Sequence, residues 1–247
     1  MKTQKLFRVT FFVMATIILT NCKTTTEKAE VIAATIDTLT TPKDIVKSQK
    51  GEVKIGTQTW TTKNLNVNTY RNGDVIPQVQ DITKWNKLTT GAWRYNYIRR
   101  RDGAWIDTCG KYYGKCYNFY AVNDARGLAP IGYHIPSDND WKILITYLGG
   151  EALAGSKLKS NISYSGQECN SLGRIGWIED NSDNSSGFSA LPGGNSDDYT
   201  GYMGFWWTSS KDEYDSACAY VIGSGGDHCL RRPQPYSSGL SVRCLKD

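Results

Sequence analysis

A single amphipathic helix in the middle of the chain is the feature that most constrains the fold. The stretch SDNDWKILITYLGG starts at Ser137, a good N-cap residue, and Asp140 three positions later completes a capping-box pattern. Gly149 and Gly150 end the helix, since glycine readily adopts the left-handed backbone of a helix terminus. Apolar residues at helical spacing form one face, which comprises Trp141, Leu144, Ile145 and Leu148. This face is expected to pack on a hydrophobic core, and it is not a cofactor site.

Short strands are expected on both sides of this helix. Residues 51–67 alternate apolar and polar side chains around a glycine, which predicts a hairpin or strand pair. The end of the chain reads as three short strands, ACAYVI, HCLRR and LSVRCL, separated by GSGGD and PQPYSSG. KCYNFYAV, at 115–122, fits either a strand or a buried turn of helix. Because strands cluster late and do not alternate with helices, we expect an α+β fold with short antiparallel strands and long irregular loops.

The N-terminus predicts export. Lys2, Lys5 and Arg8 precede an apolar run from Val9 to Leu19, which is shorter than the ~20 residues of a membrane-spanning helix and fits a secretory signal. LTNC, ending at Cys22, resembles a bacterial lipobox, in which the cysteine carries the lipid. The alternative is a conventionally cleaved signal and a free protein. We therefore expect a lipoprotein signal peptide at 1–21, a flexible threonine-rich tether at 22–50 and a folded domain at 51–247, in an outer-membrane or cell-surface lipoprotein.

The charge balance argues against a nucleic-acid partner. The formal net charge is +5, but three of the positive charges lie in the signal and leave +2 on the mature chain. Three consecutive arginines at 99–101 stand alone, without a nucleic-acid-binding motif. An exposed loop accounts for them.

Cysteine usage is consistent with an oxidising compartment. Beyond Cys22, six cysteines remain, which suggest up to three disulfides among 15 possible pairings. Short loops favour one bond across GKYYGK and one across AYVIGSGGDH, which leaves a third pair; the candidates are Cys109–Cys116, Cys218–Cys229 and Cys169–Cys244. Zinc is the competing interpretation, but the chain has no C-x-x-C pair and only two histidines, so we expect no metal and no cofactor.

Glycines and aromatic residues concentrate in GFSALPGGNSDDYTGYMGFWWTSS, at 187–210. Adjacent strand residues point to opposite faces, so Trp206 and Trp207 should not be buried on the same side. We expect one in the core, with Phe188 and Leu191, and the other packed under a loop or offered to a ligand. The predicted contact surface comprises that exposed tryptophan with Tyr199 and Tyr202.

Six ordered blocks resemble one known family. They are VKIGTQTWTTKNLNV, YGKCYNFYAV, GYHIPSDNDWKILITYLGG, SSGFSALPGG, FWWTSS and GLSVRCLKD, and they cover nearly all of 51–247. Together they resemble the Fibrobacter succinogenes major paralogous domain. That resemblance implies an exported protein of the Bacteroidetes type, often a lipoprotein, with a C-type-lectin-like fold distantly similar to formylglycine-generating enzymes. It implies no activity, and specificity is expected in the individual loops at 93–111 and 194–204.

Three functions follow as hypotheses. The first is a lipid-anchored binding module that recognises glycan or protein through its loops; it lacks the EPN, QPD and WND triplets of calcium-dependent lectins, and NSDD at 195–198 is weak evidence for calcium. The second is a structural or assembly component of the envelope. The third, an enzyme of the formylglycine-generating kind, is disfavoured because Cys244 has no cysteine neighbour, and we expect no catalytic residue. A large aromatic patch would favour protein docking, and a small concave polar site would favour glycan.

Overall fold

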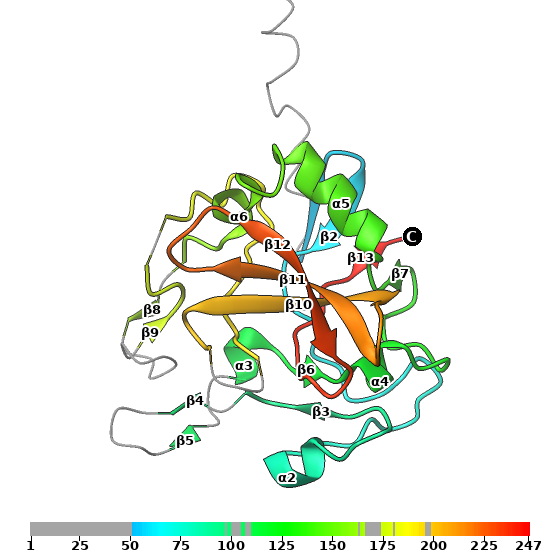
Figure 1. Ribbon diagram of the computed structural model, residues 1–247. Coiled ribbons are helices and arrows are strands. Elements are labelled where there is room, and N and C mark those ends of the chain that lie inside the picture. The colour runs from blue at the N-terminus through cyan, green and yellow to red at the C-terminus, as the bar shows by residue number, and fades with distance from the viewer. Residues whose placement is uncertain are drawn as a thin grey trace, which may run out of the picture. The chain divides into compact units, whose positions relative to one another are not determined.

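The computed structural model describes residues 51–247, apart from 97, 100–104, 107–109, 163, 166–173, 180 and 196–198. The predicted signal, the tether and Cys22 therefore lie outside the described residues, as do Cys109 and Cys169. Within the described part, no helix has the length and apolar character needed to cross a membrane. The predicted mixed architecture of small antiparallel sheets and few helices is confirmed (Figure 1).

The three longest strands form one antiparallel sheet in the order β10-β11-β12. Their bounds are β10 Met203–Lys211, β11 Ser216–Gly223 and β12 Cys229–Pro235. The predicted strand ACAYVI lies within β11, and HCLRR begins β12. LSVRCL was expected as a third strand of this group, but only Leu245 belongs to one. Instead, Ser241 accepts from the Trp207 amide at 3.0 Å and donates to the Phe205 carbonyl at 3.2 Å, so this segment covers the free edge of β10.

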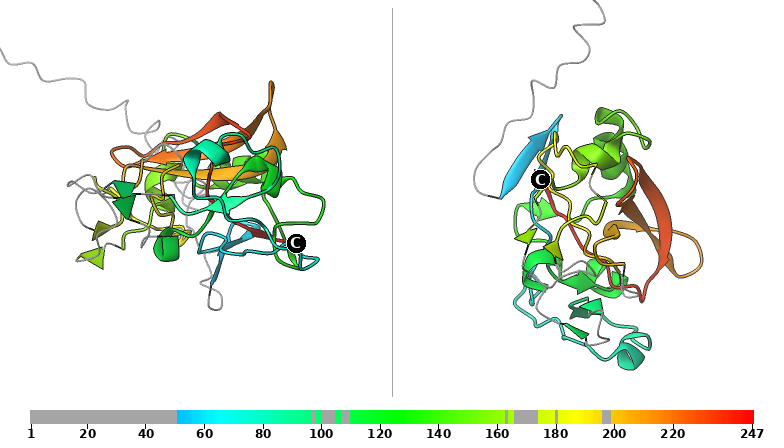
Figure 2. Two further views of the ribbon diagram at one scale, coloured as in Figure 1. Left: turned by 90° about the horizontal axis from the view of Figure 1, so that it is seen from below. Right: turned by 90° about the vertical axis from the view of Figure 1, so that its left-hand side faces the viewer.

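A second sheet of four strands lies on the other side of the domain, as both views of Figure 2 show. Its order is β1-β2-β13-β7, with bounds β1 Glu52–Ile55, β2 Gln58–Thr61, β13 Leu245–Lys246 and β7 Tyr133–His134. The hairpin predicted at 51–67 is confirmed, because β1 and β2 pair in antiparallel register. Leu245 pairs with both Trp60 and His134, which ties the C-terminus between the two halves of the sheet.

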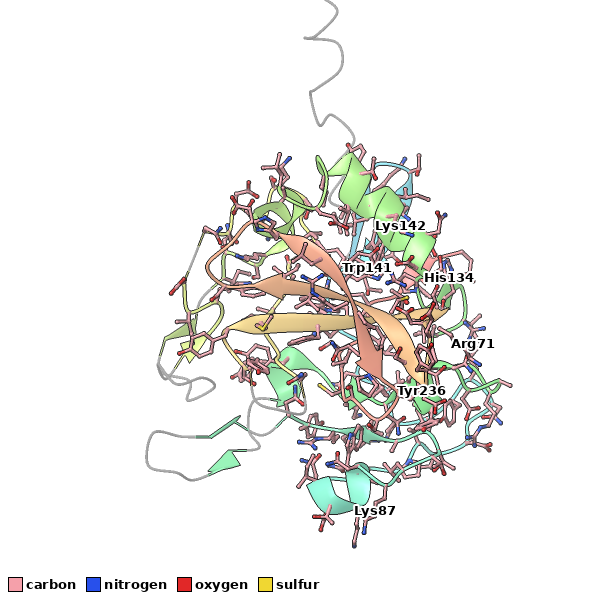
Figure 3. All side chains as sticks on the ribbon, viewed as in Figure 1. Arg71, Lys87, His134, Trp141, Lys142 and Tyr236 are labelled. Atoms are coloured by element: carbon pink, nitrogen blue, oxygen red, sulfur yellow. The ribbon has the colours of Figure 1, made fainter. Side chains whose placement is uncertain are left out.

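Helix α5, Asp138–Tyr147, covers one face of the three-stranded sheet and has the predicted caps. The Ser137 hydroxyl accepts from the Asp140 amide at 3.2 Å, and the Asp140 carboxylate accepts from the Ser137 amide at 2.8 Å. At the other end, the Gly150 amide donates to the Ile145 carbonyl at 2.9 Å. Trp141 stacks on Tyr220 of β11 with ring centroids 4.9 Å apart, and Figure 3 shows it on the sheet side of the helix while Lys142 points away.

The three-stranded sheet separates two hydrophobic clusters. Trp206 packs with Trp141 and Phe188 on the α5 side, at centroid distances of 6.3 and 6.4 Å. Trp207 faces the opposite cluster, where its ring lies 5.4 Å from Phe119. The two tryptophans therefore point to opposite faces as predicted. The expectation that one of them is offered to a ligand is wrong, because both side chains are 0% exposed.

The remaining elements are short and lie in the long connections. Near the site described below are α2 Ile82–Trp85, β3 Trp93–Arg94, β6 Cys116–Tyr117 and α4 Phe119–Val122. Elsewhere lie α3 Gly110–Tyr113, α6 Ala154–Leu158 and the pairs β4 Ile98–Arg99 with β5 Trp105–Ile106 and β8 Tyr164–Ser165 with β9 Arg174–Ile175. The segment 115–122, read from sequence as strand or helix, contains one of each, β6 and α4.

Strand β12 is an edge strand with two prolines. Its Cys229 amide points away from β11 and donates to the Glu151 carbonyl at 2.8 Å. Since amide direction alternates along a strand, Pro233 and Pro235 occupy the same outward positions, where they have no N–H to offer. The prolines are therefore compatible with pairing to β11, and the strand continues through them although the sequence had suggested that it ends at 232.

The predicted Cys218–Cys229 disulfide is wrong. Cys116, Cys218, Cys229 and Cys244 are buried free thiols. The register of β11 with β12 pairs Cys218 with Pro233 and Ile222 with Cys229, so Cys218 and Cys229 lie at different levels of the sheet. For Cys116 and Cys244, the predicted partners Cys109 and Cys169 lie outside the described residues.

Candidate functional site

An apolar hollow on the three-stranded sheet is lined in part by Met203, which directly follows Tyr202, and by Phe205, whose ring lies near that of Tyr199. Tyr199 and Tyr202 are 46% and 47% exposed, and the Tyr199 ring lies 6.3 Å from that of Phe205. The hollow has a volume of about 310 Å³ and is lined mainly by Met203, Phe205, Val221 and Leu230, with the exposed His228 and Arg232 beside them. Of the four residues in the predicted contact surface, the two tyrosines are exposed and the two tryptophans are buried.

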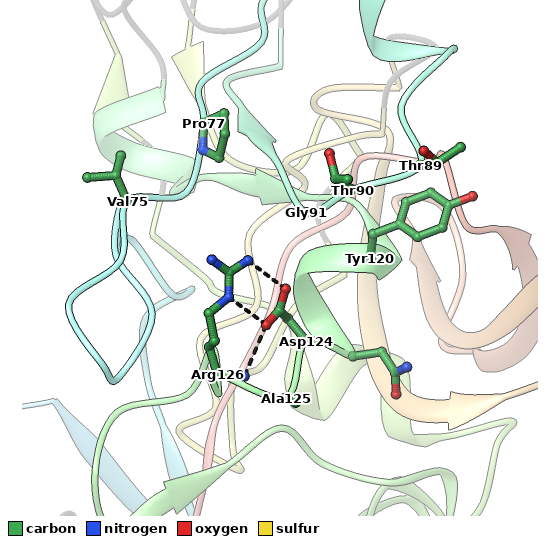
Figure 4. Close-up of a pocket in the computed structure, with 10 residues that line it drawn as sticks. Val75, Pro77, Thr89, Thr90, Gly91, Tyr120, Asp124, Ala125 and Arg126 are labelled. Atoms are coloured by element: carbon green, nitrogen blue, oxygen red, sulfur yellow. Dashed lines mark hydrogen bonds and ion pairs between the residues drawn. The ribbon is translucent and has the colours of Figure 1, made fainter.

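A second, polar pocket of about 450 Å³ lies at the C-terminal end of α4 (Figure 4). Three segments that are distant in sequence form its walls. Val75 and Pro77 come from one loop, residues 89–91 precede β3, and residues 120–126 contain the end of α4 and the turn that follows. This pocket was not predicted from the sequence, and it lies outside the loops at 93–111 and 194–204.

Asn118 holds two of these walls together. It is the N-cap of α4, and its side-chain oxygen accepts from the amides of Ala121 and Ala92, each at 3.0 Å. Its side-chain nitrogen donates to the Thr90 carbonyl at 2.9 Å. The residue is fully buried, so a single amide side chain caps the helix and fixes the segment before β3 against it.

Gly91 permits the close approach of the 89–91 wall. A Cβ atom at this position would lie 2.0 Å from the Tyr70 hydroxyl and 2.9 Å from the Ala121 Cα. Any other residue would therefore push the wall outward from α4. Burial, and then the Asp124 carboxylate, raise the pKa of Tyr70 to about 12, so its hydroxyl stays protonated beneath the pocket.

An arginine between two carboxylates forms the charged side of the pocket. Arg126 donates through Nε and Nη2 to the two Asp124 oxygens at 2.9 and 2.8 Å, and through Nη1 to Asp74 at 3.1 Å. The guanidinium also covers the Tyr70 ring at 4.1 Å. The hydrogen bonds from Arg126 lower the pKa of Asp124 to about 2, and those from Asn72 and Arg126 lower the pKa of Asp74. At neutral pH the trio carries a net charge of −1.

The other side of the pocket offers an aromatic ring and uncommitted polar groups. Figure 4 shows Tyr120 beside Thr89, with Thr90 and Gly91 between them and the Asp124–Arg126 pair. The side chains of Thr89, Thr90 and Asn123 make no hydrogen bond with the described part of the chain, and all three are exposed. An aromatic face with hydroxyl, amide and carboxylate groups around it suits an uncharged, hydroxyl-rich ligand.

The structure offers no metal centre in the part that it describes. No group of three or more His, Cys, Asp or Glu side chains there is placed to hold an ion. Of the NSDD segment that had suggested calcium weakly, Asn195 is buried and 196–198 lie outside the described residues.

Comparison with known proteins identifies one family. The sequence profile of the Fibrobacter succinogenes major domain matches residues 53–246. The chain therefore belongs to that family. No curated protein and no solved structure matches the chain.

Proposed function

We propose that this chain is a lipid-anchored protein of the cell envelope whose lectin-like domain binds a neutral glycan in the pocket at the end of α4. The lectin-like frame is supported by the small antiparallel sheets, the capped helix α5 and the family membership. The anchor is supported by the signal peptide predicted at 1–21 and by the lipobox-like LTNC, which ends at Cys22. The proposed activity is binding, without catalysis.

The observation that carries the proposal is the polar concave pocket beside an aromatic ring. Tyr120 can stack on the apolar face of a sugar ring, while Thr89, Thr90 and Asn123 exchange hydrogen bonds with its hydroxyls.

The charge of the pocket selects against acidic sugars. Arg126 is already held by Asp124 and Asp74, so it has no free fork for a sulfate or carboxylate. A uronic acid or sulfated sugar would meet a net negative site. We therefore expect binding of neutral oligosaccharides and none of their sulfated or uronic counterparts.

A glycan array with neutral, sulfated and uronic oligosaccharides, followed by calorimetry on the neutral series that bind, tests the proposal. Tyr120→Ala should weaken binding about tenfold, since loss of one ring contact is worth ~1.4 kcal/mol. Tyr202→Ala is the matched control, because it removes an exposed tyrosine next to the apolar hollow. If Tyr202→Ala abolishes binding and Tyr120→Ala leaves it intact, the pocket at α4 is not the site.

The anchor has a separate test. Labelling cells with a palmitate analogue should mark the wild-type protein and not Cys22→Ser. Label that persists in Cys22→Ser contradicts lipidation at this cysteine, and protease shaving of intact cells reports whether the domain lies outside.

A second candidate function, docking to an envelope protein, is favoured by the apolar hollow beside Tyr199 and Tyr202. A photo-crosslinking residue in place of Tyr202 should then join the protein to one envelope component, whereas the same residue in place of Lys142 should not. Equal yields from both positions argue against docking at the hollow.

A further inference from the structure

The aromatic side of the pocket continues beyond Tyr120. The Tyr120 ring lies 5.8 Å from that of Tyr236 in an edge contact, and Tyr236 stacks on Phe119 of α4 with centroids 4.8 Å apart. Figure 3 shows Tyr236 just past the end of β12. A second ring therefore follows the first along the surface.

The tip of the β10–β11 hairpin lies next to this second ring. The Tyr236 amide donates to the Asp215 carbonyl at 3.1 Å, which fixes the tip against the segment after β12. Tyr214, adjacent to Asp215, is 94% exposed.

The backbone at the tip is strained to present that tyrosine. Tyr214 and Asp215 have φ of 51° and 53°, the left-handed conformation required at both central residues of a type I′ turn. Asn, Asp and Gly are the favoured residues in such turns, so Asp215 suits its position and Tyr214 does not. A large ring that is fully exposed, at a position where asparagine or glycine is more stable, indicates a role outside folding.

We propose that Tyr214 and Tyr236 extend the α4 pocket into a linear site for an oligosaccharide chain longer than the pocket itself holds. This inference rests on the proposed function, and it specifies the ligand as a chain of neutral sugars. Tyr120 binds the unit in the pocket, Tyr236 supports the chain where it leaves the pocket, and Tyr214 stacks on a unit farther along. Successive aromatic rings accept consecutive units because each ring offers one flat face.

Calorimetric titration of the wild type with the disaccharide and the hexasaccharide of each neutral series on the array tests this inference. The hexasaccharide should bind about tenfold more tightly than the disaccharide, the change that one additional ring contact of ~1.4 kcal/mol produces. Tyr214→Asn should reduce hexasaccharide affinity to the disaccharide level and leave disaccharide affinity unchanged. Tyr214→Phe should behave as the wild type.

The asparagine variant separates binding from folding. Asn suits a type I′ turn, so the melting temperature of Tyr214→Asn should equal or exceed that of the wild type. Equal affinities for both lengths, or full hexasaccharide affinity in Tyr214→Asn, overturn the extended site while binding in the pocket stands. If Tyr120→Ala weakens disaccharide binding and Tyr214→Asn does not, the result supports the pocket independently of the extended site. If no neutral series binds, both proposals fail.

Discussion

Arg243 is a buried cation that is surrounded by carbonyl oxygens. Its side chain is 1% exposed and donates to the carbonyls of Thr61, Phe188 and Ser189 at 2.8, 2.6 and 2.9 Å. Its Nε donates to the Asn64 side chain at 2.7 Å. Burial lowers the pKa of Arg243 to about 9, so the side chain is still charged at neutral pH. The guanidinium therefore joins β2, the loop after Gly187 and the C-terminal segment.

Replacing Arg243 should destabilise the domain strongly. Arg243→Leu removes the donors and leaves several buried oxygens without partners, at about 1–3 kcal/mol for each group. We expect a loss of about 3 kcal/mol or more in the free energy of unfolding, measured by urea titration. Arg243→Lys keeps the positive charge but loses the branched set of N–H donors. Its free energy of unfolding should lie between those of Arg243→Leu and the wild type. A Leu variant as stable as the wild type contradicts this role.

The Asp124–Arg126 pair gives the domain a defined acid dependence. The pKa of Asp124 falls from its ordinary 3.8 to about 2 on folding, so its stabilisation is present above pH 3.8 and is lost as pH falls through about 2. Solvent reaches the guanidinium of this pair, so the contribution of the pair to stability should be small. The unfolding free energies of wild type and Asp124→Asn, compared from pH 7 to 2, should converge in that window. If the two unfolding free energies differ by the same amount from pH 7 to 2, the pair does not set the acid dependence.

At the scale of elements, two sets of hydrogen bonds stabilise the N-terminus of α5. The capping box closes its first turn, and Asp138 accepts from the Tyr220 hydroxyl and from Arg231 Nε, each at 3.1 Å. The negative charge also suits the positive end of the helix dipole. The same turn that starts the helix thus attaches it to the three-stranded sheet.

Ser137→Ala should cost about 1 kcal/mol, because the Asp140 amide loses its side-chain acceptor. Ser137→Asp, which retains an N-cap oxygen, is the matched control and should recover most of the loss. Chemical denaturation with tryptophan fluorescence measures both, since Trp141 lies on the buried face of this helix. If Ser137→Asp loses as much stability as Ser137→Ala, the serine acts by packing and not as a hydrogen-bond acceptor.

Elements whose signals are local were predictable from sequence. Helix α5 carries its own caps, and the β1–β2 hairpin has its own alternation and glycine turn. The C-terminal end of β12 and the pairing of the LSVRCL segment were not predictable. Both depend on which distant residues form hydrogen bonds with them. The Cys218–Cys229 prediction failed for a related reason, because the register set by the connecting turn places Ile222 opposite Cys229.

At the scale of the molecule, the described cysteines behave as core residues. Burial raises the pKa of Cys116 and Cys244 to about 12, and it raises those of Cys218 and Cys229 as well. The reactive thiolate is therefore scarce near pH 8. Iodoacetamide should leave these four cysteines unmodified in the native protein and modify them in denaturant, as read by peptide mapping. A linked Cys218–Cys229 peptide from the non-reduced protein contradicts the free thiols.

The polar pocket at the end of α4 could not be predicted from the sequence, because its walls come from segments that are far apart in the chain. Its walls come from 75–77, 89–91 and 120–126, and none of these segments has a pattern that indicates the other two. Asn118 brings two of them together through hydrogen bonds between residues far apart in the chain. An asparagine ahead of the apolar stretch FYAV was the available signal, and it indicated only an N-cap.

The two prolines of β12 have a consequence for contacts between copies of the domain. A strand added alongside β12 would find no hydrogen-bond donor at either proline, so neighbouring copies have little means of joining their sheets there. An exposed strand edge is a template for aggregation, so Pro233 and Pro235 protect this edge of the three-stranded sheet from lateral growth.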